Sequence, residues 1–124
     1  MLALFIRAYF MLIYFDVYLV RGNFAALYSE VRNHPLHKMP RPGDPIQKIC
    51  SAVDLACIWY WKEVLCLQRS AATTCLLRGN GVSAQMIIGA QKLPFRAHAW
   101  VEVDGHVVND KPYMREVYAV LERC

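Results

Sequence analysis

The sequence predicts an α+β fold, in which helices fill the N-terminal half and a small antiparallel sheet follows. Residues 2–78 contain segments whose apolar side chains recur at helical spacing and whose ends carry asparagine, proline or glycine signals. Residues 82–110 instead alternate apolar and polar side chains and include the hairpin pair Asp104-Gly105. At 124 residues and 56% hydrophobic content, the chain is long enough for one well-packed domain and too short for two.

An apolar helical arm is expected over residues 1–33. Residues 2–20 form its first helix, and residues 24–33 form a second, amphipathic helix with Asn23 as the N-cap. The longest uninterrupted apolar run in the first helix falls far short of the ~20 residues that a membrane span requires. We therefore interpret it as a buried or interface helix, with loose membrane contact through residues 1–20 as the alternative.

A proline-rich connector, residues 34–45, follows the arm and leads to the remaining core, residues 46–124. Its four prolines and one glycine favour an extended chain. Asp44 and Pro45 then supply a capping carboxylate and a first-turn proline for a helix over residues 46–62. We treat the arm, the connector and the core as parts of one domain.

The elements after this helix are another helix and three strands. The helix is expected over residues 66–78, because glycines at 79 and 81 supply stop signals. The alternating pattern places strands at residues 82–90, 97–103 and 106–110, with a loop over residues 91–96. Residues 113–123 fit either a short helix or a strand.

Composition and charge narrow the classes of function. The net charge of +4 is mild and no basic run is interleaved with aromatic residues, so nucleic acid is not an expected partner. Five cysteines without a CxxC pair indicate free thiols in a reducing compartment, and hence a cytoplasmic protein without a zinc site. His34 and His37 flank a proline and are interpreted as solvated loop residues. No phosphate-loop motif is present, so no cofactor is expected, and any use of ATP would belong to a partner.

Cys66 is the candidate nucleophile, because it is the cysteine expected at the start of a helix. A helix N-terminus and a nearby imidazolium both lower the pKa of a thiol and favour the reactive thiolate. Cys75 follows half a revolution further round the same helix and is expected to face the core. Cys124 is the last residue of the sequence.

His98 is the candidate general base. On its strand it shares a face with Trp100 and Glu102, while the opposite face carries small apolar residues that belong to the core. An exposed strand face with an unrelated histidine is the simpler alternative. An orienting acid must lie within hydrogen-bond reach of the imidazole, and Glu102 lies ~13 Å away at ~3.3 Å per residue. Asp110, on the returning strand, is therefore the candidate acid.

The choice of Asp110 constrains the turn of the hairpin. A two-residue loop at Asp104-Gly105 would place Asp110 opposite Ala99 and turn the carboxylate to the wrong face. A three-residue loop would place it opposite His98. We therefore predict a three-residue, bulge-type hairpin with its glycine in the left-handed conformation.

The strings that carry these residues resemble those of the lasso-peptide leader peptidases, which have a transglutaminase-like, papain-type core. The matching strings are Cys66-Leu67-Gln68-Arg69-Ser70, Gly81-Val82, Ile88-Gly89, Pro94-Phe95-Arg96-Ala97-His98-Ala99-Trp100-Val101-Glu102-Val103 and Val108-Asn109-Asp110. The match covers about residues 44–112. The sequence His-Ala-Trp-Val-Glu is shared by many transglutaminase-like proteins, and its combination with Cys-Leu-x-Arg-Ser and Phe-Arg-Ala-His is more specific.

The resemblance implies a cysteine peptidase that removes the leader from a ribosomally made precursor peptide. It supports a Cys66, His98 and Asp110 triad, with backbone N–H groups at the helix start holding the oxyanion. Four more side chains are candidates for substrate or oxyanion binding: Trp61, Gln68, Arg69 and Trp100. Of these, Arg69 is expected to pair with a carboxylate inside the fold in preference to the leader, and Trp100 is expected to wall the cleft.

The resemblance also implies partners. No recognition domain fits before residue 44, so the chain is expected to act with a separate leader-recognition protein and a lasso cyclase, for which the arm is a candidate docking surface. Three other functions remain open from the residues alone. They are an amine acyltransferase with the same triad, a non-catalytic scaffold that binds precursor or partner, and a membrane-associated basic protein.

Overall fold

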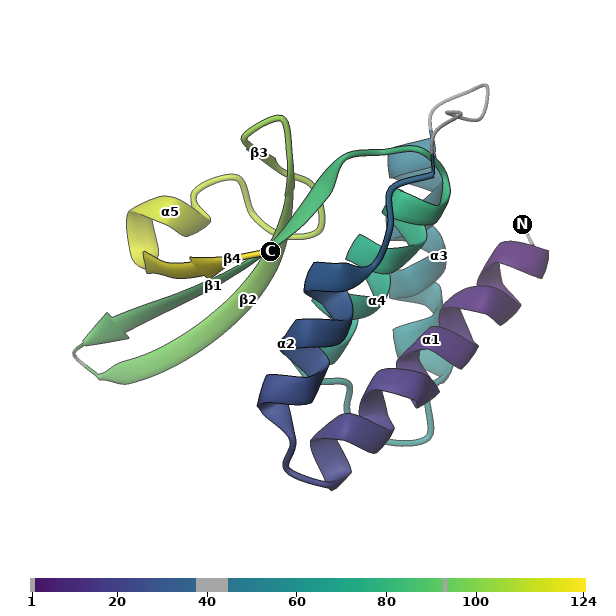
Figure 1. Cartoon of the computed structure of the whole chain (residues 1–124), viewed down its shortest axis with the longest axis horizontal. Helices are drawn as coiled ribbons and strands as arrows, with labels where there is room; N and C mark the ends of the chain where they lie inside the picture. Colours follow the sequence, from purple (N-terminus) through teal and green to yellow (C-terminus); the bar gives the residue numbers. More distant parts are fainter. Residues whose placement is uncertain (1, 38–44, 93) are drawn as a thin grey trace.

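The computed structural model describes residues 2–37, 45–92 and 94–124, and it has the α+β class that the sequence predicts. Four helices gather on one side of a four-stranded antiparallel sheet of order β3-β2-β1-β4 (Figure 1). In chain order the elements are α1 (Leu2–Val20), α2 (Phe24–Asn33), α3 (Pro45–Trp59), α4 (Cys66–Gly79), β1 (Ala84–Lys92), β2 (Phe95–Val103), β3 (His106–Val107), α5 (Met114–Val117) and β4 (Ala119–Arg123).

Helix α1 packs on α3 and α4 and contributes to the same core as the rest of the chain. Its buried side chains Ala8, Leu12 and Phe15 follow helical spacing, while its opposite face is exposed. The predicted cap of α2 is confirmed, because the Asn23 side chain accepts a hydrogen bond from the backbone N–H of Ala26 at 3.1 Å. The predicted arm is therefore joined to the core by packing. By length and composition alone α1 would also suit a membrane span, a test that soluble core helices pass as well.

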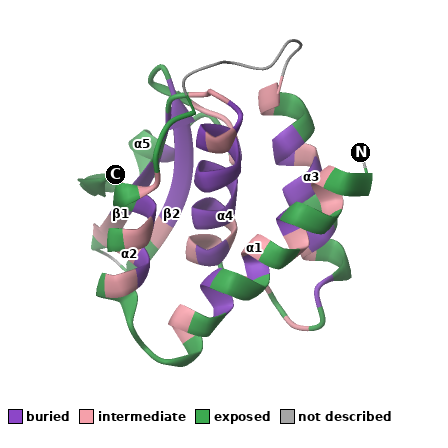
Figure 2. Cartoon of the chain, turned by 45° about the vertical axis from the view of Figure 1, so that its right-hand side comes forward, coloured by how far each residue is buried: buried purple, intermediate pink, exposed green. Residues whose placement is uncertain are grey.

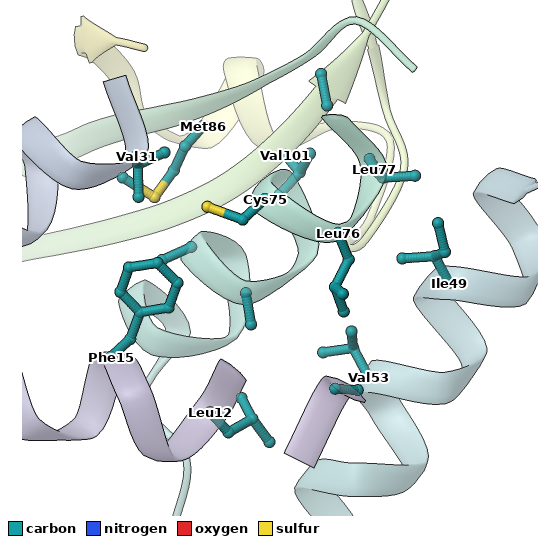
Figure 3. Packing of buried hydrophobic residues seen from close by; sticks show 14 of the residues in the cluster. Leu12, Phe15, Val31, Ile49, Val53, Cys75, Leu76, Leu77, Met86 and Val101 are labelled. Carbon is teal, nitrogen blue, oxygen red and sulfur yellow. The ribbon is translucent and has the colours of Figure 1, made fainter. Parts of the chain in front are cut away.

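Helix α4 lies at the centre of the fold, between helices α1 and α3 and the sheet (Figure 2). Apart from Arg69, each residue from Gln68 to Arg78 is buried. Figure 3 shows its Cys75, Leu76 and Leu77 among side chains from α1, α3 and the sheet, so Cys75 faces the core as predicted. Because α4 is fixed on several sides, the residue at its N-terminus is held in a defined position.

Helix α3 begins at Pro45, as predicted, but ends at Trp59 and not at residue 62. The reason lies in a buried carboxylate on α1. The Tyr60 hydroxyl donates to Asp16 Oδ2 at 2.7 Å, and Lys62 Nζ lies 2.8 Å from Asp16 Oδ1. These two contacts hold residues 60 and 62 against α1, so the chain leaves the helical conformation after Trp59. The predicted cap Asp44 lies outside the described residues.

The β1–β2 hairpin is longer than predicted. Its pairing runs from Ala84 opposite Val103 to Lys92 opposite Phe95, so the predicted loop over residues 91–96 is wrong. Pro94 lies at the turn, where the N–H that proline lacks is not needed for the ladder. At the other end, the backbone N–H of Val82 donates to Leu77 O in the turn that follows α4. Strand β1 therefore begins at Ala84 and not at residue 82.

Residues 113–123 contain both a helix and a strand. Helix α5 covers the face of the sheet that points away from α4, where Met114 packs with Ile87 and Trp100. Strand β4 then pairs with β1. The sheet thus lies between a large helical layer and a small C-terminal cover.

Candidate active site

Helix α4 begins at Cys66, as predicted, and the thiol-bearing residue is partly exposed. Leu65 before it has an extended backbone, and no side chain caps this end of the helix. The first N–H groups of a helix have no partner within the helix, and they carry the positive end of its dipole. This end of α4 therefore combines a thiol with donors suited to a developing negative charge.

His98 and Asp110 form a short hydrogen-bonded pair. The His98 Nε2 atom lies 2.6 Å from Asp110 Oδ2, and both side chains keep some contact with solvent. The second oxygen of Asp110 accepts a hydrogen bond from the backbone N–H of Lys111 at 2.8 Å. An ionised Asp110 carboxylate can only accept, and in that state Nε2 carries the proton and Nδ1 is the unprotonated nitrogen of the neutral ring.

The hairpin between β2 and β3 does not have the predicted three-residue loop. Val103 pairs with His106 and Glu102 with Val107, which leaves a two-residue loop. Both loop residues have positive φ, 52° at Asp104 and 79° at Gly105, as a type I′ turn requires. The prediction was wrong because it assumed a regular ladder as far as Asp110.

Asp110 reaches His98 because the ladder stops before it. The last regular bond joins the Val108 N–H to Val101 O at 3.0 Å. The N–H of Val101 then donates to the side-chain oxygen of Asn109 at 2.8 Å, where a regular ladder would use a backbone carbonyl. The chain leaves the strand at this point, so the pairing register no longer decides which way the Asp110 side chain points.

The first two turns of α4 contact the neighbours of this pair. Ser70 Oγ donates to Ala99 O at 3.1 Å, and an Arg69 guanidinium nitrogen donates to Asn109 O at 2.7 Å. Cys66 lies one turn before Ser70 on the same helix face, a rise of ~6 Å. Among the residues that the structure describes, no hydrogen bond joins the Cys66 thiol to His98. Such contacts often form only when substrate binds.

The other predicted site residues have varied surroundings. Arg69 pairs with Asp54, with Nε 3.0 Å and a terminal nitrogen 2.8 Å from Oδ1, which confirms the internal pairing expected for it. The Gln68 amide is buried and donates to Leu12 O of α1 at 2.8 Å, an interaction that ties two helices together. Trp61 is 71% exposed in the segment before α4.

Trp100 has a different place from the one expected. It is fully buried beneath α5, so it packs against the His98 ring inside the protein and does not line an open cleft. Its indole N–H donates to Glu102 at 2.8 Å. A groove of about 380 Å³ does open beside the α4 N-terminus, between α1 and the segment before α4. Asp16, Leu19, Val20, Lys62, Glu63, Leu65 and Gln68 line it.

Sequence reasoning missed Asn109, Tyr118 and the role of Glu102. Asn109 stands directly before the candidate acid, and its buried side chain also donates to Ser70 Oγ at 3.2 Å. Tyr118 stacks on the His98 ring, and Glu102 is a buried carboxylate that binds Arg115. Asparagine at the end of a hairpin was the one local signal available.

Three other thiols lie in surroundings that disfavour the thiolate. Burial raises the pKa of Cys57 to about 11 and that of Cys75 to about 12. Burial also raises the pKa of Cys124. No disulfide bond joins any two of the five cysteines, all of which lie within the described residues. Across residues 2–37, 45–92 and 94–124 no group of three or more His, Cys, Asp or Glu side chains is arranged to hold a metal ion.

A family model described as the transglutaminase-like superfamily matches residues 11–123, so the chain belongs to this superfamily. The matched span begins inside α1, so residues 11–33 of the arm are part of the family match. The microcin J25-processing protein McjB of Escherichia coli is 41% identical over 56 residues, which are 45% of this chain and 27% of McjB. The likeness that the sequence strings indicate is thus confirmed, while the matched segment spans only about a quarter of McjB. No solved structure matches this chain.

Proposed function

We propose that this protein is a cysteine peptidase that removes the leader from a ribosomally made precursor during lasso peptide biosynthesis. The observation that carries the proposal is the His98–Asp110 pair, 2.6 Å apart, beside the helix that begins at Cys66. A nucleophile, a base and an orienting acid are the groups that acyl transfer from a peptide requires. The likeness to a microcin-processing protein supports a peptide substrate.

The chemistry follows from the arrangement of the three groups. The Cys66 thiol gives its proton to His98 Nδ1, and the thiolate attacks the carbonyl carbon of the scissile bond. Backbone N–H groups at the start of α4 hold the oxyanion that forms. The imidazolium then gives its proton to the leaving amine of the core peptide, and Asp110 stabilises the imidazolium through Nε2. Water hydrolyses the thioester that links the leader to Cys66, with His98 as the base.

We place this activity in the cytoplasm, in an assembly with a separate leader-recognition protein and a lasso cyclase. The exposed face of α1 is the proposed docking surface. Its large apolar side chains recur every three or four residues along the helix: Leu2, Ile6, Phe10, Ile13, Val17 and Val20. Any dependence on ATP enters through a partner.

The experiment that tests the proposal supplies a candidate precursor and recognition protein to the wild type and to Cys66→Ala. Cys57→Ala is the matched control, because this second partly buried thiol has a raised pKa and lies on α3. We expect leader release with the wild type and the control, and none with Cys66→Ala. Mass spectrometry separates hydrolysis from transfer to an amine. Unchanged leader release by Cys66→Ala would overturn the proposal.

The docking surface is tested by point substitutions, because deletion of α1 would remove core side chains. The double variant Phe10→Ser, Val17→Ser changes two exposed residues of the α1 face. Leu121→Ser changes an exposed residue of β4 and is the control. We expect the double variant alone to lose co-purification with the recognition protein, at an unchanged melting temperature. Retained binding would count against this surface.

A further inference from the structure

We propose that Tyr118 is a positioning residue, which holds the imidazole of His98 in the orientation that keeps Nε2 on Asp110. The inference rests on the proposed function, because it gives that orientation a role in the same reaction. The imidazole has two orientations that are related by a flip about its Cβ–Cγ bond. Only one of them places Nε2 on Asp110 and leaves Nδ1 for the thiol.

Three aromatic rings meet on the sheet face that α5 covers. The ring of Tyr118 lies 5.2 Å from that of His98 between centroids, at an interplanar angle of 25°. Trp100 lies 6.2 Å from His98 at 27° and 6.1 Å from Tyr118 at 39°. Both neighbouring rings are therefore nearly parallel to the imidazole plane. Rotation about its Cβ–Cγ bond would turn the edge of the imidazole into these neighbours.

Gly89 of β1 provides the space for this arrangement. It is the cross-strand partner of His98, so a side chain there would project from the same face of the sheet. A Cβ at this position would lie 2.7 Å from Trp100 Cη2 and 2.9 Å from Tyr118 Cβ. Only glycine lets both rings pack this closely over β1.

The C-terminal segment fixes Tyr118 from both sides. Before it, Arg115 of α5 donates through Nε to Glu102 at 2.8 Å and makes a second bond through a terminal nitrogen. Glu102 is itself buried and also accepts from the Trp100 indole. After it, β4 pairs with β1, with Val120 opposite Gly89. The backbone of Tyr118 therefore cannot move away from His98 without breaking the Arg115–Glu102 ion pair or a strand pairing.

The ring of Tyr118, and not its hydroxyl, makes the contact. Within the part of the chain that the structure describes, the Tyr118 hydroxyl has no hydrogen bond, and the residue is half-buried. Phenylalanine keeps the ring and leucine removes it. A comparison of Tyr118→Phe with Tyr118→Leu therefore separates the stack from a general packing effect.

The first readout is the spectrum of the histidine side chains in 13C- and 15N-labelled protein, with His98 assigned from His98→Gln and the exposed His106 as the reference. We expect ring-current-shifted His98 signals with the Nε2-protonated tautomer in the wild type and in Tyr118→Phe. In Tyr118→Leu we expect these signals to move toward the His106 positions and the nitrogen shifts to average. Loss of the ring-current shift alone follows from removal of the ring, so a Tyr118→Leu variant that keeps the Nε2-protonated tautomer with unaveraged nitrogen shifts overturns the inference.

The second readout is leader removal with the reconstituted partners. A misplaced catalytic group costs on the order of 10²-fold in rate, so we expect kcat of Tyr118→Leu to fall by about that factor at an unchanged KM. Tyr118→Phe keeps the wild-type kcat. If Tyr118→Leu does not fold, Arg115→Gln, which loosens α5 from the sheet, is expected to give the same changes in a weaker form.

The two proposals fail in different ways. A wild-type kcat in Tyr118→Leu, in an assay where Cys66→Ala is inactive, overturns the role of Tyr118 and leaves the peptidase standing. Full activity of Cys66→Ala overturns the peptidase, and the catalytic role of Tyr118 with it, even if the spectra show the ring held by the stack.

Discussion

The side-chain oxygen of Asn109 lies 2.8 Å from the backbone nitrogen of Val101 and takes its hydrogen bond. This contact ends the β2–β3 ladder one residue before Asp110. It also links the hairpin to α4, because the Asn109 amide nitrogen donates to Ser70 Oγ at 3.2 Å. A single buried side chain thus connects the helix that begins at Cys66 with the loop that carries the candidate acid.

Asn109→Ala is expected to destabilise the fold and to lower activity together. It leaves the buried N–H of Val101 without its partner, which costs about 1–3 kcal/mol in the free energy of unfolding. It also frees Asp110 from the geometry that points it at His98. Urea unfolding measures the first effect, and leader removal measures the second.

Asn80→Ala is the matched control for this prediction. Asn80 is equally buried and its amide donates to Leu76 O at 2.7 Å, at the opposite end of α4. We expect a similar loss of stability with kcat retained at a temperature where both variants are folded. Equal losses of kcat in the two variants would show that Asn109 acts only through global stability.

The helices were predictable because their signals are local. Asn23 and Pro45 each stand at or beside a helix start that short-range capping and proline rules identify. The end of α3 was missed because it depends on Asp16, a residue from a distant helix. Long-range contacts of this kind leave no mark in local spacing.

The candidate site was predictable as a set of residue types and only partly as geometry. The need for an acid beside His98 identified Asp110 correctly as its hydrogen-bond partner. The predicted geometry was wrong. A three-residue loop was expected to turn the Asp110 side chain toward His98, whereas the loop has two residues and the Asn109 side chain ends the regular pairing before Asp110. Tyr118 was missed because residues 113–123 have no single periodicity, and only the fold brings them to the sheet.

Gly89→Ala tests the packing that surrounds His98. The added Cβ would lie less than 3.0 Å from the Trp100 ring and from Tyr118 Cβ, so these two side chains must shift. Overpacking of this kind costs about 1–3 kcal/mol. We expect a lower urea midpoint and reduced leader removal.

Gly79→Ala is the control for the glycine substitution. Nothing lies within 4 Å of the Cβ position at this last residue of α4. Alanine in a helix is favoured over glycine by about 0.5–1 kcal/mol, so the control is expected to be neutral or stabilising. A stable, fully active Gly89→Ala variant would contradict the close packing of the three rings.

Alkylation is expected to select Cys66. Burial raises the pKa values of Cys57, Cys75 and Cys124, and Cys50 is buried, so these thiols react slowly near neutral pH. Iodoacetamide at pH 7.5 should add one group rapidly, and peptide mapping should place it on Cys66. Cys66→Ala removes this fast step, whereas unfolding in urea makes the remaining thiols reactive. Rapid labelling of another cysteine in the folded protein would contradict the prediction.

The buried carboxylates on α1 and β2 predict a loss of stability in acid. Burial alone would raise the pKa of Asp16, but hydrogen bonds from Lys62 and Tyr60 hold it below its ordinary value. Burial likewise opposes ionisation of Glu102, and the hydrogen bonds from Arg115 and Trp100 outweigh it and lower the pKa. The folded state therefore binds fewer protons than the unfolded state, so these groups stabilise the fold above their unfolded pKa values of about 4.

This stabilisation is present at neutral pH and is lost as the pH falls through the lowered pKa values of the folded state. Urea midpoints measured from pH 7 to pH 3 at constant ionic strength should decline toward acid in the wild type. Asp16→Asn keeps an acceptor for Tyr60 but removes one of the two titrations, so its midpoint should start lower and decline less steeply. Asp104→Asn, in the exposed turn, should follow the wild-type slope. A wild-type slope in Asp16→Asn would show that its ion pair with Lys62 contributes nothing to stability.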